Sequence, residues 1–139
     1  MKFRFLDRVV SCDLEGPGRI VTLKTFSRTE DYLEGPFHSP SRIPSSLVLE
    51  TMAASGGRLI EVVSQDNAFG LVLRVEDARF LSPVAPGDQV LVRSELLGMQ
   101  DQRGESIALA RTQGQASVEG KPVAEARIVF LCVPAKEFR

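Results

Sequence analysis

The sequence holds few cysteines and histidines. Its 139 residues include two cysteines, Cys12 and Cys132, and a single histidine, His38. Two cysteines near opposite ends provide neither a disulfide framework nor a Cys/His cluster of zinc spacing, so we expect the chain to fold without disulfides or metals. We expect both cysteines to be small hydrophobic core residues in a reducing compartment. Chemistry that needs imidazole has one candidate per chain.

The chain also lacks an excess of charge of either sign. Seventeen Lys plus Arg stand against eighteen Asp plus Glu, which gives a net charge of −1. Nucleic-acid binding depends on neutralising phosphates with basic residues, so no nucleic-acid partner is expected. The charged start, residues 1–5, does not suit a signal peptide, and the apolar run 128–133 is too short to span a bilayer. We expect a cytoplasmic protein that does not enter a membrane.

Hydrophobic periodicity and turn residues divide the chain into strands and one helix. Residues 3–12 predict a strand or an irregular lead-in, and strands are predicted at residues 19–26, 69–80, 89–97, 105–118 and 122–133. Glycine-rich and polar turns separate them at residues 16–18, 85–88, 101–104 and 119–121. Residues 27–44 contain three prolines and no apolar period, which predicts a loop, and this loop holds His38.

One helix is predicted at residues 47–63, entered through Pro44 and a capping serine. Glu50 is the only charge between Pro44 and Gly57, so the helix lacks the charged face of a surface helix and we expect it to be buried on most sides. Gly56 and Gly57 each cost roughly 1 kcal/mol relative to Ala in a helix. We therefore expect another backbone to pack closely at that point.

The order of elements is two strands, one buried helix and four strands. A helix that is apolar all round needs a sheet long enough to wrap it, and a mostly antiparallel sheet does so. The sequence therefore predicts an α+β hot-dog fold, in which the sheet wraps around one long central helix. With no internal repeat or linker, residues 1–139 are expected to form a single domain.

Residues 78–89 form the most distinctive motif, Ala-Arg-Phe-Leu-Ser-Pro-Val-Ala-Pro-Gly-Asp-Gln. It resembles the Ala-Arg-Phe-x-x-Pro-Val-x-Pro-Gly-Asp turn of the FabZ/FabA-type 3-hydroxyacyl-acyl carrier protein dehydratases. Residues 5–9 and 118–126 resemble that family's opening Leu-x-Asp-Arg-Val and its closing hairpin. The resemblance runs nearly end to end and implies the hot-dog fold. It identifies the fold better than the reaction, because hot-dog proteins of several activities share this turn.

The catalytic loop departs from the pattern of that family, Gly-His-Phe-Pro-Gly-Arg-Pro-x-Met-Pro-Gly followed by a helical glutamate. Glu50 falls where the family's acid lies, and counting back from it without gaps puts Pro36 in the place of the histidine. A register with two residues deleted instead aligns His38 with the histidine and Arg42 with the arginine. We favour the second register because it recovers His, Pro and Arg in order. Under either register Ser45 replaces a glycine, and Ala54 replaces a glutamine one turn beyond the acid.

The resemblance implies a dehydratase-like hydro-lyase acting on a 3-hydroxyacyl thioester, on acyl carrier protein or coenzyme A, in fatty acid or related acyl-chain biosynthesis. His38 would be the base and Glu50 the acid. The backbone amides of Ser45 and Ser46 would bind the thioester oxygen, and Arg42 would orient the loop. The resemblance further implies a homodimer or higher homo-oligomer, with base and acid from different protomers, and no cofactor or metal.

Other interpretations of the same residues stay open. His38 and Arg42 also suit solvated positions, and Glu50 also suits a structural bond to an arginine or to loop backbone. Basic strand residues Lys24, Arg74 and Arg79 suit either an acidic carrier protein or a solvated strand face, of which we favour the second. There are two alternative functions. The chain could be an acyl thioesterase that uses Glu50 without histidine, or a catalytically silent acyl-binding subunit.

Overall fold

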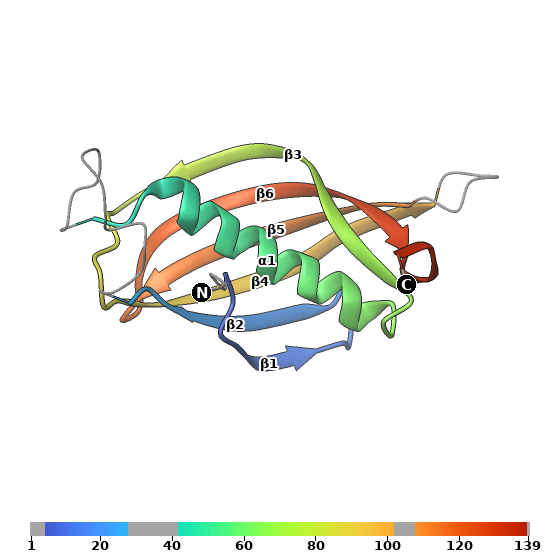
Figure 1. Ribbon diagram of the computed structural model, residues 1–139, viewed down its shortest axis with the longest axis horizontal. Coiled ribbons are helices and arrows are strands. Elements are labelled where there is room, and N and C mark those ends of the chain that lie inside the picture. The colour runs from blue at the N-terminus through green and yellow to red at the C-terminus, as the bar shows by residue number, and fades with distance from the viewer. Residues whose placement is uncertain (1–4, 28–41, 102–107, 139) are drawn as a thin grey trace.

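The structure, a computed structural model, describes residues 5–27, 42–101 and 108–138. Its elements are β1 (Arg8–Asp13), β2 (Arg19–Thr25), α1 (Ser45–Val63), β3 (Ala68–Phe80), β4 (Gln89–Asp101), β5 (Ala108–Val118), β6 (Lys121–Pro134) and the short 3-10 helix η2 (Ala135–Phe138). The strands form a six-stranded antiparallel sheet in the order β1-β2-β4-β5-β6-β3, and α1 runs diagonally across one face of it (Figure 1). This confirms the predicted α+β hot-dog architecture.

The core lies between α1 and the sheet. Seven residues of α1 are buried, Val48, Thr51, Met52, Ser55, Gly56, Leu59 and Ile60. The Ser55 hydroxyl oxygen accepts hydrogen bonds from the hydroxyls of Thr22 on β2, at 3.0 Å, and of Ser94 on β4, at 3.1 Å. All three side chains are buried, so these bonds fix the middle of α1 over two strands while leaving no hydroxyl unsatisfied.

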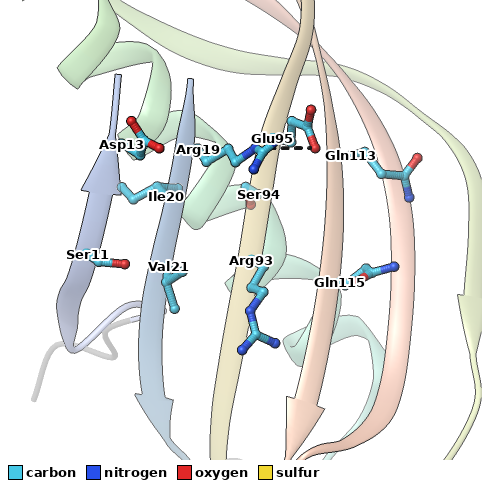
Figure 2. Close-up of a pocket in the computed structure, with 10 residues that line it drawn as sticks. All are labelled: Ser11, Asp13, Arg19, Ile20, Val21, Arg93, Ser94, Glu95, Gln113 and Gln115. Carbon is cyan, nitrogen blue, oxygen red and sulfur yellow. Dashed lines mark ion pairs between the residues drawn. The ribbon is translucent and has the colours of Figure 1, made fainter. Parts of the chain in front are cut away.

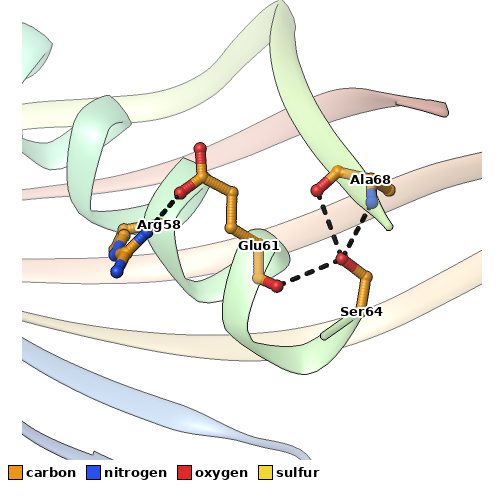
Figure 3. Close-up of polar contacts among 4 residues, drawn as sticks. All are labelled: Arg58, Glu61, Ser64 and Ala68. Atoms are coloured by element: carbon orange, nitrogen blue, oxygen red, sulfur yellow. Dashed lines mark hydrogen bonds and ion pairs between the residues drawn. The ribbon is translucent and has the colours of Figure 1, made fainter. Parts of the chain in front are cut away.

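The start of α1 lacks the predicted serine cap, whereas a serine does hold the end of the helix. The helix begins at Ser45, two residues earlier than predicted, and Pro44 occupies the cap position with no side-chain hydrogen bond. The Pro44 carbonyl accepts hydrogen bonds from the amides of Leu47 and Val48. At the other end, Ser64 Oγ contacts the Glu61 carbonyl and both backbone polar groups of Ala68, at 3.1–3.2 Å, and so joins α1 to β3 (Figure 3).

Lys24 differs from the sequence interpretation, because it is buried rather than placed on a solvated strand face. Side chains of β2 alternate in burial, and Lys24 follows Ile20 and Thr22 on the buried side. Its Nζ lies 3.4 Å from Asp7 Oδ1 and 5.8 Å from the centre of the Phe26 ring. The ion pair and the ring offset the cost of burying the charge.

Three further details were not predicted. Cys12 is exposed on β1, an edge strand, so the expectation of a core cysteine holds only for Cys132. β4 continues four residues past Leu97, to Asp101, and η2 follows β6 directly.

No helix in the described part of the chain is long and apolar enough to cross a membrane.

Candidate active site

Glu50 lies in the second turn of α1, exposed at one end of a groove of about 410 Å³ between α1 and β3. The groove is lined by Ala53, Ala54 and Gly57 from the same helix, by Gly70 and Val72 from β3, and by Phe130 and Leu6. These walls are apolar. A carboxyl beside an apolar groove suits an acid that acts on a bound group with a long apolar part.

Glu50 forms no ion pair or side-chain hydrogen bond with any other described residue. Of the two structural roles that the sequence left open, a bond to an arginine is absent within the ranges described, and a bond to the backbone of the loop at residues 28–41 lies outside them. The expectation that the helix is buried on most sides holds for the side facing the sheet, whereas the side that carries Glu50 is open.

Ser45 and Ser46 are the first two residues of α1 and are exposed. Amides at the start of a helix have no acceptor within the helix, and the first turn of α1 contains no acidic residue that would neutralise the helix dipole. These amides can therefore donate to a developing negative charge. Ser45 lines a second groove, of about 260 Å³, together with Arg42, Phe80 and Leu81.

The structure thus brings Arg42 and Ser45 to one groove and places Glu50 in another. Glu50 follows Ser45 by five residues, about 7.5 Å along the helix axis. His38 lies outside the described residues, so its position relative to Glu50 stays a prediction.

The far end of the Glu50 groove is polar. Arg58 and Glu61 both line it, and Arg58 donates a hydrogen bond to Glu61 Oε2 at 2.7 Å (Figure 3). This hydrogen bond to the carboxylate raises the pKa of the Arg58 guanidinium. The groove therefore runs from a carboxyl group, along an apolar stretch, to an ion pair.

A groove of about 540 Å³ lies elsewhere. It is on the face of the sheet that points away from α1 and is lined by polar side chains that include Arg19, Arg93, Glu95 and Gln113 (Figure 2). Arg19 and Glu95 form an exposed ion pair at 3.9 Å. None of the predicted site residues lies there, and within the described ranges no three His, Cys, Asp or Glu side chains cluster as metal ligands would.

Sequence reasoning missed the walls of the Glu50 groove, although the Gly56-Gly57 pair drew attention to its position. The close neighbour of Gly56 is the Phe130 ring, a side chain and not the backbone that we expected. The other walls come from β3 and β6, which are distant in sequence, and only the folded chain brings them to α1.

Known proteins similar to this chain agree with the fold. A family model described as the FabA-like domain matches residues 1–127. The 3-hydroxyacyl-acyl carrier protein dehydratase FabZ of Symbiobacterium thermophilum is 35% identical over 136 residues, which cover 96% of this chain and 89% of the relative.

Solved structures of two kinds are similar. The dehydratase heterocomplex ApeI:P from Xenorhabdus doucetiae has a TM-score of 0.71 at 18% identity, covering 97% of this chain and 86% of that one. The thioesterase HI1161 from Haemophilus influenzae has a TM-score of 0.63 at 14% identity, covering 88% and 77%. At these identities the two structures support the hot-dog fold and leave the reaction open.

Proposed function

The chain belongs to the FabA-like domain family, and we propose that it is a hydro-lyase that interconverts 3-hydroxyacyl and 2-enoyl thioesters. Relatives at 32–35% identity over more than nine-tenths of the chain are named 3-hydroxyacyl-acyl carrier protein dehydratases. The observation that supports the proposal most directly is the exposed carboxyl of Glu50 at the end of an apolar groove.

The reaction needs three groups. A base removes a proton from C2, an acid protonates the hydroxyl on C3 so that it leaves as water, and donors stabilise the thioester oxygen while the C2–C3 double bond forms. We assign His38 as the base, Glu50 as the acid and the amides of Ser45 and Ser46 as the donors. Arg42, beside Ser45 in its groove, orients the loop that carries His38.

The active molecule in this proposal is a homodimer formed along β3. This strand of 13 residues is an edge of the sheet, yet Leu71, Val72 and Leu73 are 45%, 50% and 54% exposed. Long apolar edge strands are avoided in monomers because they pair with other chains. A second copy on β3 would cover these side chains and would lie next to the Glu50 groove, so that Glu50 can meet the His38 loop of its partner.

Assays of the purified protein test the proposal. We expect water loss or addition with a 3-hydroxyacyl or a 2-enoyl thioester, on acyl carrier protein or on coenzyme A, followed at the absorbance of the conjugated enoyl group. Failure to convert either substrate on either carrier overturns the proposal.

The structural similarity to thioesterases motivates a second candidate, in which Glu50 promotes thioester hydrolysis. The variant His38→Ala separates the two functions. Dehydration should collapse in it, whereas hydrolysis, measured as free thiol release, should survive. Acyl-ligand binding with no turnover of any kind would instead indicate a catalytically silent subunit.

A further inference from the structure

Two adjacent glycines in α1 have different surroundings. A Cβ added at Gly56 would lie 2.9 Å from the Phe130 ring and 3.0 Å from Thr112 Oγ1, so any side chain there would force the core to shift. A Cβ added at Gly57 would meet only the carbonyl oxygen of Gly70, at 3.9 Å, and Phe130 Cε1, at 4.0 Å, which are ordinary contact distances. Packing among the described residues therefore does not explain Gly57, although it costs about 1 kcal/mol of helix stability relative to Ala.

Gly57 does line the groove that begins at Glu50. It follows Glu50 by seven residues, about 10 Å along the helix axis. Between the two, the helix side of the groove is formed by Ala53 and Ala54. A side chain at position 57 would project into the groove two turns beyond Glu50, and its absence keeps the groove open as far as the Arg58–Glu61 ion pair.

We infer that Gly57 determines specificity for the length of the acyl chain, by letting long chains pass along α1. This inference rests on the proposed function, in which C3 of the substrate lies beside Glu50. An extended chain spans roughly 1.2 Å per bond, so an acyl group reaches Gly57 about eight bonds beyond C3. Short acyl groups end before Gly57, and a fourteen-carbon group passes it.

The experiment compares Gly57→Leu with wild type on six-carbon and fourteen-carbon 3-hydroxyacyl thioesters of the same carrier. Leucine is a good helix former, so α1 should persist. Gly98→Leu is the matched control: it adds the same side chain on β4, outside the groove, where an added Cβ meets nothing within 4 Å. Thermal unfolding and sedimentation velocity of all three proteins report folding and oligomeric state.

We expect Gly57→Leu to lower kcat/KM for the fourteen-carbon substrate, relative to the six-carbon substrate, by tenfold or more. The ratio in Gly98→Leu should match wild type. An equal fall for both substrates, an unchanged ratio, or conversion of Gly57→Leu to a smaller oligomer than wild type would overturn the inference, the last because it assigns Gly57 to a contact between chains.

Binding of non-reactive thioether analogues of the two substrates keeps this test separate from the test of the reaction. If wild type converts neither substrate, the proposed function fails, but the inference still predicts that Gly57→Leu weakens binding of the fourteen-carbon analogue tenfold or more relative to the six-carbon analogue. Equal binding of both analogues to wild type and variant would overturn it.

Discussion

Glu50 is exposed and forms no ion pair or side-chain hydrogen bond with another described residue. A substitution there should therefore change activity without changing the stability of the fold. The variant Glu50→Gln keeps the size of the side chain but has no proton to give to a leaving hydroxyl. Because general acid catalysis contributes about 10²–10⁴-fold, kcat should fall by about 100-fold or more. The free energy of unfolding should change by no more than about 0.5 kcal/mol, as for other surface substitutions.

Steady-state kinetics and urea unfolding check this prediction, with Glu95→Gln as the matched control. Glu95 lies on the opposite face of the sheet, in the groove that holds no predicted site residue, so its variant should keep the wild-type kcat. If Glu50→Gln retained activity within tenfold of wild type, Glu50 would not be the acid.

The surroundings of Gly56 and Gly57 predict that replacement by alanine changes the free energy of unfolding in opposite directions at the two positions. Gly56→Ala should lower the free energy of unfolding by about 1–3 kcal/mol, because the added methyl group overlaps the Phe130 ring and the core must shift. Gly57→Ala should raise it by about 0.5–1 kcal/mol, because the methyl group fits and the unfolded chain loses freedom. Urea titrations of both variants measure the difference, and a gain in stability for Gly56→Ala would contradict the packing described for α1.

At the scale of the element, β3 is predicted to be the strand that joins two chains. Leu71→Lys places a charge on its exposed surface, so the monomer should still fold while the dimer is lost. Sedimentation velocity should show the variant at half the mass of the wild-type dimer, with an unchanged circular dichroism spectrum. Leu97→Lys on β4, where the leucine is similarly exposed, is the control and should remain dimeric. A dimeric Leu71→Lys would place the interface elsewhere.

The bounds of the strands were predicted closely where turn residues next to them in the sequence mark their ends. β3 and β6 begin within one residue of their predicted starts because turn residues precede both strands. The end of β4 was missed because a bulge between Leu96 and Gly98 interrupts the alternation that would have extended it. Lys24 was misplaced because a charged side chain was assumed to face solvent, whereas the register of β2 turns it inward toward Asp7.

The candidate site was predictable only in part. Glu50 stands out because it is the only charge between Pro44 and Gly57, and Ser45 because it lies at the start of the helix. The groove between Glu50 and β3 was not predictable, since it depends on how far α1 lies from Val72 and Phe130, and no sequence pattern reports that separation. The catalytic assignment therefore depends on the family, whereas the inference about Gly57 depends on the folded chain.

At the scale of the whole molecule, the proposed homodimer predicts an active site that two chains share. One chain places Arg42 and Ser45 in one groove and Glu50 in another, and the proposed second copy on β3 would lie next to the Glu50 groove. Each dimer would then hold two sites, each with His38 from one protomer and Glu50 from its partner.

Mixed dimers of two inactive variants test this arrangement. When His38→Ala and Glu50→Gln are unfolded together and refolded, half of the dimers contain one chain of each kind. Each mixed dimer then holds one site with an intact His38 and an intact Glu50, because the two defects fall together in the other site. Activity should therefore return to about a quarter of the wild-type value, on the two-fold symmetry of such a dimer. Each variant refolded alone is the control, and a mixture no more active than these controls would mean that both groups of a site belong to one chain.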